Sequence, residues 1–178
     1  MRDGKFDLVG KPRRRVDGRA KVLAKTVFAD DIVLPRMVHM KLLRSPHPHA
    51  RIRSIDASRA EAHPDVLLVL TGKDVPNPYG ILPVSQDETA LAQDRVRHVG
   101  DPVAAVVAID EATAEEALER IEVAYEPLET IASPAEALAK PEPRIHDYGE
   151  EGNIHKRASF TFGDVDGALA GADLVHEH

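Results

Sequence analysis

Apolar and polar positions change their period between residues 99 and 128, and this stretch gives the clearest structural signal in the chain. Residues 103–109 are apolar at every position, which is typical of a strand that is buried on both faces beneath helices. Four apolar residues then recur at helical spacing: Ala114, Ala117, Leu118 and Ile121. A period-2 pattern begins at Val123 and predicts a second strand. The stretch is therefore predicted to form a β-α-β unit.

Side-chain caps mark the starts of the predicted helices. Thr113 is the expected N-cap of the helix that follows residue 109, because Glu116 three residues later would complete a capping box. Similar signals predict three more short helices. The first runs from a cap at Asp56 or Ser58 to Ala62, the second from Ser133 to Ala139, and the third from Asp164 or Asp166 to Ala170.

Further strands are predicted where apolar residues alternate with polar ones or run continuously, at residues 37–44, 51–55, 66–70, 95–99, 158–162 and 174–178. Residues 51–55 alternate charged and apolar side chains, which indicates a strand with one face in water. Residues 21–31 fit a short strand or a loop equally well. The whole pattern predicts an α/β (α+β) chain, with a mixed β-sheet and short helices packed on it.

Composition divides the chain into four parts. Residues 1–19 form a basic arm, residues 20–140 carry the main domain, and residues 141–157, rich in proline, glycine and charge, form a linker. Residues 158–178 are expected to begin a connection to a further, missing domain, because the last predicted strand has no partner after it. The arm is either solvated and mobile or docked on an acidic partner surface.

The stretch at residues 99–128 and several others resemble the alpha/beta hammerhead domain of the molybdenum hydroxylases, the family of xanthine dehydrogenase, aldehyde oxidase and 4-hydroxybenzoyl-CoA reductase. The other matching stretches lie in the same order as in that family, at residues 16–18, 29–32, 43–52, 55–56, 70–76, 162–166 and 172–173. Residues 78–84 and 91–97 look most like the catalytic subunit of 4-hydroxybenzoyl-CoA reductase.

This resemblance implies a function for the parent protein. The chain would be the N-terminal, non-catalytic domain of a cytoplasmic molybdenum-dependent oxidoreductase that removes an aromatic hydroxyl from an aryl-CoA thioester. The alternative parent hydroxylates a xanthine, aldehyde or N-heterocycle with water as the oxygen source. In both cases this fragment alone is expected to be inactive.

The same resemblance implies the cofactors and partners. Molybdopterin, in its cytosine dinucleotide form, would be held by a molybdopterin-binding domain of the same polypeptide, through glycine-rich loops and a catalytic Glu that have no counterpart here. Partner subunits would carry [2Fe-2S] clusters and FAD. We therefore assign no catalytic, cofactor-binding or metal-binding residue to this chain.

Composition narrows the remaining choices. The chain has no cysteine, which excludes disulfides, thiolate zinc sites and thiolate iron–sulfur ligation within it. A net charge of −7 and only 4% aromatic residues disfavour nucleic-acid binding. No apolar run reaches the roughly 18 residues of a membrane-spanning helix, so no membrane partner is expected.

Two groups of residues remain as candidates. Arg44, His47 and His49 lie in a proline-rich loop, a usual place for recognition, and would face a neighbouring domain or the substrate path. The alternative is a packing loop whose Arg and His bind backbone carbonyls. Gly100, Asp101 and Pro102 form a tight structural turn, since Pro102 has no N–H to offer a phosphate.

Histidine pairs keep a third class of function open. His47 and His49 lie two apart, as do His176 and His178, and either pair could bind a metal if a third ligand converged. A small metal-dependent enzyme is therefore one alternative. A free-standing α/β assembly or binding module is the other.

Overall fold

The computed structural model describes residues 6, 8–81, 86–149 and 151–176, and the chain divides into two units, residues 1–37 and 38–178. The first unit holds α1 (Gly18–Val22) and a 3-10 turn, η1 (Ala29–Asp31). Residues 21–31, which fitted a strand or a loop, thus contain helical turns. The N–H of Phe28 donates to the Asp31 carboxylate at 2.9 Å and closes the second of these turns.

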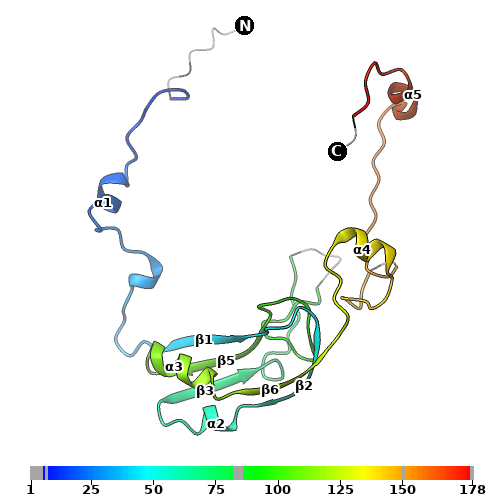
Figure 1. Ribbon diagram of the computed structural model, residues 1–178. Helices are drawn as coiled ribbons and strands as arrows, with labels where there is room; N and C mark the ends of the chain where they lie inside the picture. Colours follow the sequence, from blue (N-terminus) through cyan, green and yellow to red (C-terminus); the bar gives the residue numbers. More distant parts are fainter. Residues whose placement is uncertain (1–5, 7, 82–85, 150, 177–178) are drawn as a thin grey trace. The chain divides into compact units, whose positions relative to one another are not determined.

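The second unit contains two three-stranded sheets (Figure 1). The first, here called the β5 sheet, has the strand order β1-β5-β3, with β1 at His39–Arg44, β5 at Pro102–Ala108 and β3 at Val66–Thr71. The second, the β2 sheet, has the order β4-β2-β6, with β4 at Arg95–Val96, β2 at Ala50–Asp56 and β6 at Glu122–Pro127. The predicted α/β class is confirmed, and each strand pair in the two sheets is antiparallel.

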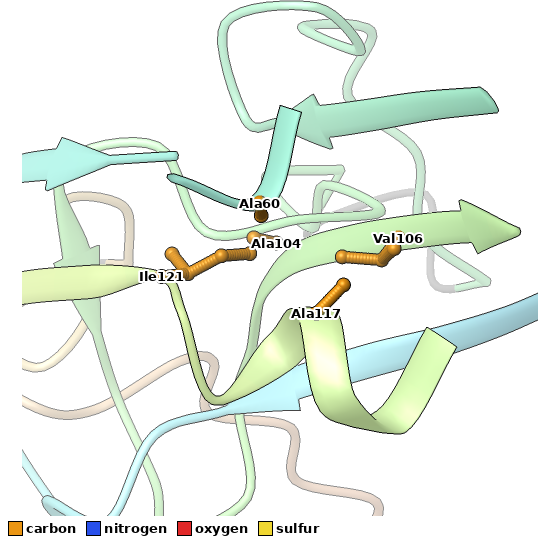
Figure 2. Close-up of a cluster of buried hydrophobic side chains, with 5 residues drawn as sticks. All are labelled: Ala60, Ala104, Val106, Ala117 and Ile121. Carbon is orange, nitrogen blue, oxygen red and sulfur yellow. The ribbon is translucent and has the colours of Figure 1, made fainter. Parts of the chain in front are cut away.

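Two short helices, α2 (Ser58–Glu61) and α3 (Glu111–Leu118), cover one face of the β5 sheet. Figure 2 shows the contact: Ala60 and Ala117 lie over Ala104 and Val106 of β5, and Ile121 closes the end. Most of these side chains are small, which lets the helix backbones approach the sheet closely. This cluster is the larger of the two buried cores.

The predicted strand, helix and strand of residues 99–128 are present, but the β-α-β arrangement is wrong. β5 lies in one sheet, and β6 lies in the other, where it pairs with β2. The apolar residues of β6 match those of β2, so that Tyr125 lies opposite Ile52 and Val123 opposite Ile55. Periodicity identified each element, whereas the choice of partner came from this match between distant strands.

The cap predicted at Thr113 is also wrong. Asp110 is the N-cap of α3, and its carboxylate accepts the N–H of Thr113 at 2.7 Å. This hydrogen bond holds the pKa of Asp110 below its ordinary value, because it favours the charged form. At α2, Ala57 takes the N-cap position and the Asp56 carboxylate accepts the N–H of Ser58 at 3.0 Å.

Two other predicted caps are confirmed. Ser133 accepts the N–H of Glu136 at the start of α4 (Pro134–Ala139). Asp164 accepts the N–H of Gly167 at the start of α5 (Val165–Ala170).

Three predicted strands are shortened or absent. Of residues 95–99 only Arg95 and Val96 pair with a neighbouring strand, because the N–H of Arg97 donates to the Asp101 side chain instead. Residues 158–162 are irregular and exposed, and no strand among the described residues pairs with them. Residues 174–176 are irregular too, while the rest of that predicted strand, with His178, lies outside the described residues.

Candidate functional site

The loop of Arg44, His47 and His49 and the turn of Gly100, Asp101 and Pro102 lie against each other, although they are far apart in sequence. The N–H of Ser45 donates to the carbonyl of Asp101 at 2.9 Å, and the N–H of Gly100 donates to the carbonyl of Ser45 at 2.8 Å. The Arg44 guanidinium donates to the Gly100 carbonyl at 2.8 Å. We call residues 44–49 and 97–102 together the loop–turn junction.

The turn within this junction is closed by its own side chain. The Asp101 carboxylate accepts the N–H of Arg97 at 2.9 Å, while the N–H of Asp101 donates to the His98 carbonyl at 3.2 Å. Gly100 has φ +90°, a conformation that side chains with a Cβ rarely adopt. A Cβ at Gly100 would meet no atom within 4 Å, so the backbone angle, and not lack of space, requires the glycine.

The two loop histidines do not converge on a common point. His47 packs edge-on against Tyr125, with ring centroids 4.9 Å apart. His49 is buried, and its Nδ1 lies 2.7 Å from the carbonyl of Glu129. A carbonyl only accepts, so Nδ1 carries the proton and donates it. Within residues 6, 8–81, 86–149 and 151–176 no group of three or more His, Asp or Glu side chains is placed to hold a metal ion.

Tyr125 joins the junction to the β2 sheet. Burial raises the pKa of its hydroxyl, a hydrogen bond with Ser45 lowers it, and the negative charge of Asp101 adds a smaller rise. The hydroxyl therefore stays protonated at neutral pH and can donate a hydrogen bond within the junction.

An open cleft of about 600 Å³ borders the junction. Residues 97–98 and 101–102 form one side. The remaining walls come from two groups of described residues: Tyr79, residues 87–89 and Ala92, and Ile145, His146, Tyr148 and His155. Its lining combines acidic and aromatic side chains, including Asp87, His146 and Tyr148. His146 and Asp87 form a direct pair at 2.8 Å across the cleft wall.

Two arginines that were not among the predicted site residues hold the cleft wall at residues 144–147 in place. Arg95 donates to the carbonyl of Arg144 at 3.1 Å and to the Asp147 carboxylate at 2.8 Å. Arg97 donates to the carbonyl of Ile145 at 2.9 Å. Their spacing of two residues in an alternating segment places both side chains on one face, a signal that could have identified them.

Comparison with known proteins identifies the fold. The family described as aldehyde oxidase and xanthine dehydrogenase, a/b hammerhead domain, matches residues 23–129. The chain is 44% identical over 173 residues to a probable xanthine dehydrogenase subunit from Bacillus subtilis (strain 168), covering 96% of this chain and 23% of that protein. It is 38% identical over 174 residues to the nicotinate dehydrogenase large molybdopterin subunit from Eubacterium barkeri, covering 97% of this chain and 40% of that one.

Solved structures agree with this result. Quinoline 2-oxidoreductase from Pseudomonas putida 86 superposes with a TM-score of 0.65 at 38% identity, over 75% of this chain and 18% of that chain. Aldehyde oxidoreductase from Desulfovibrio gigas gives a TM-score of 0.68 at 30% identity, over 75% of this chain and 16% of that chain. The chain thus spans less than half the length of these relatives.

None of the helices in the described part of the chain is both long and apolar enough to pass through a membrane. The strands, the covering helices and the matched residues all lead to one conclusion: the chain belongs to the molybdenum hydroxylase family of aldehyde oxidase and xanthine dehydrogenase, and residues 23–129 match its a/b hammerhead domain.

Proposed function

We propose that this chain is the N-terminal, non-catalytic part of the large subunit of a cytoplasmic molybdenum-dependent oxidoreductase. One observation carries the proposal: three side chains of the candidate site, Arg44, His49 and Arg97, donate to backbone carbonyls. Arg44 binds Gly100, His49 binds Glu129, and Arg97 binds Ile145. Each of these side chains fixes a distant segment of its own chain, as a scaffold requires.

The reaction we favour for the parent enzyme is hydroxylation of a xanthine-like, aldehyde or N-heterocyclic substrate. The names of the relatives support this choice, since they refer to xanthine, nicotinate, quinoline and an aldehyde. Removal of a hydroxyl from an aryl-CoA thioester, suggested by residues 78–84 and 91–97, stays as the alternative. Residues 82–84 of the first stretch lie outside the described residues.

The cleft of this chain does not fit the molybdopterin dinucleotide. Its phosphates need amide or guanidinium donors. The cleft is instead lined by three carboxylates, Asp87, Glu88 and Asp101, and Arg97, the one guanidinium among the described residues of its lining, is held through Nε by the carbonyl of Ile145. The proposal therefore places molybdopterin, in its cytosine dinucleotide form, in another domain of the same polypeptide. Partner subunits would carry [2Fe-2S] clusters and FAD, and the loop–turn junction would help to wall the substrate path.

The test uses the complete large subunit, produced together with its partner subunits in water labelled with oxygen-18. With an electron acceptor supplied to take up the two electrons released, we expect about one molybdenum per large subunit. We also expect oxygen-18 in the hydroxyl group added to an N-heterocycle, or oxidation of an aldehyde to its carboxylate. The 178-residue chain alone should bind no molybdenum and turn over neither substrate class. Reduction of 4-hydroxybenzoyl-CoA by the complete enzyme would favour the alternative reaction, and a complete enzyme without molybdenum would reject the proposal.

A further inference from the structure

The strand register separates the two faces of the β5 sheet. Val106, Lys41 and Val69 are mutually paired and lie on the face that α2 and α3 cover; Lys41 also pairs with Glu111 of α3. The neighbouring positions point to the opposite side. We call that side the open face, and it consists of Met40, Leu42, Leu68, Leu70, Ala105 and Val107.

The open face is apolar at all six positions and forms two rows across the sheet. One row is Met40, Val107 and Leu68, and the other is Leu42, Ala105 and Leu70. Met40 and Leu68 remain 59% and 48% exposed, whereas Val106 on the covered face is fully buried. The middle of the face is already shielded from water within this chain, since Ala105 is 3% exposed.

Water on one side of an antiparallel sheet normally selects polar residues at alternate positions. The open face carries no polar side chain at the six paired positions, and the described residues place α2 and α3 on the other side. This is the pattern of a sheet that lies between two layers. A contiguous apolar patch that crosses three strands is a common mark of an interaction surface.

We propose that the open face is covered by apolar side chains from the remainder of the large subunit. This inference rests on the proposed function, which makes the chain one part of a longer polypeptide. The lengths of the relatives support this occupant, because the same fold covers only 16–18% of the solved chains that contain it. The layer that the sheet lacks would then come from the same polypeptide.

The experiment compares the 178-residue chain with the complete large subunit, each carrying Met40→Asp and Leu68→Asp together. We expect little change in the melting temperature of the 178-residue chain, because both side chains already contact water there. The complete subunit should melt several degrees lower and be cut faster by protease, because two charges would enter a buried contact. Ser54→Asp, an exposed change on β2, is the matched control and should be mild in both proteins.

Three results would overturn the inference. Equal and small changes in both proteins would mean that the face stays in water. A second copy would be the occupant if the 178-residue chain is dimeric, the double change makes it monomeric, and the same change leaves the complete subunit unaffected. If the double change prevents folding of the 178-residue chain, Leu68→Ser decides: an equal loss of stability in both proteins would contradict the inference, and a larger loss in the complete subunit would support it.

The outcome is separable from that of the proposed function. Molybdenum content is measured on the unchanged large subunit, whereas the open face is tested through melting and proteolysis. A large subunit without molybdenum would reject the function while the stability comparison still reports whether the face is covered.

Discussion

The two sheets of this domain have three strands each but differ in the polarity of the face that points away from the core. In the β2 sheet, Ile52, Ile55, Val123 and Tyr125 pack inward, and the paired positions between them are exposed. In the β5 sheet the side chains that face away from α2 and α3 are apolar as well. The β2 sheet has one buried face and one face exposed to solvent, whereas the β5 sheet has the side-chain pattern of a sheet that needs another protein layer.

This difference bears on the division of labour within the domain. The β2 sheet meets the loop–turn junction through Tyr125, which packs on His47, and it positions the arginines that hold the cleft wall. The β5 sheet supplies the larger core and the open face. Both sheets thus border the candidate site, since Arg44 ends β1 and Pro102 begins β5, but only the β5 sheet also offers an apolar surface for assembly.

Two adjacent residues of β5 test most directly whether the covered and open faces of this sheet differ. Val106→Ala should lower the free energy of unfolding by about 2 to 3 kcal/mol, because it leaves a cavity beneath the helices. Val107→Ala, the same change on the open face, should cost less than about 1 kcal/mol in the 178-residue chain. Urea unfolding of both variants measures the difference, and equal losses would show that the two faces are not distinct.

The link between the sheets is tested at Gly100, in the turn between β4 and β5. Gly100→Val should cost about 1 to 3 kcal/mol, because a β-branched residue would have to hold φ +90°. Gly100→Asn is the control, since asparagine tolerates positive φ better. If the valine variant melts together with the unchanged chain, the glycine is not required by its backbone angle.

Acid should loosen the covered face of the β5 sheet through the cap of α3. The hydrogen bond from the Thr113 N–H lowers the pKa of Asp110 in the folded state. The stability that this cap contributes is therefore fully present above the pKa of about 3.9 in the unfolded chain, and it is lost as the pH falls through the lower pKa of the folded state. Asp110→Ala should lower the melting temperature at pH 7 and reduce the further loss below about pH 4. A variant whose melting temperature differs from the parent by the same amount at pH 7 and pH 3 would contradict this.

The smallest effect is expected on the wet face of the β2 sheet. Arg53 and Glu126 form an exposed ion pair there, and such pairs contribute about 0.2 to 1 kcal/mol. A double-mutant cycle with Arg53→Ala and Glu126→Ala should give a coupling energy in that range at low salt, and less at 1 M salt. A coupling above about 2 kcal/mol would mean that this face is not open to water.

Local sequence signals predicted a feature correctly where the side chain and the group it binds lie within a few residues of each other. Ser133 and Asp164 cap their helices because each side chain reaches an N–H three residues later. At α3 the predicted cap was Thr113, whereas Asp110, which precedes Thr113 by just that spacing, is the residue that caps the helix. Element type was therefore predictable, while the first residue of a helix was not always so.

Contacts between distant segments could not be read from the pattern. The candidate residues Arg44 and Gly100 were found separately, and only the structure places them in hydrogen-bond contact. The strand predicted at residues 158–162 shows the converse, because the alternation of Phe160 and Phe162 has no partner strand among the described residues. Period-2 patterns predict a strand only where another strand is available.

Thiol labelling can show directly whether the open face is covered, because the 178-residue chain has no cysteine of its own. Leu68→Cys and, as a control on the β2 sheet, Ser54→Cys would be introduced separately into this chain and into the complete large subunit, with the labelled peptide located by mass spectrometry. We expect Leu68→Cys to react quickly in the 178-residue chain and to be strongly protected in the complete subunit. Ser54→Cys should react in the 178-residue chain, which shows that the reagent reaches folded protein. Equal reactivity of Leu68→Cys in both proteins would contradict the expected protection.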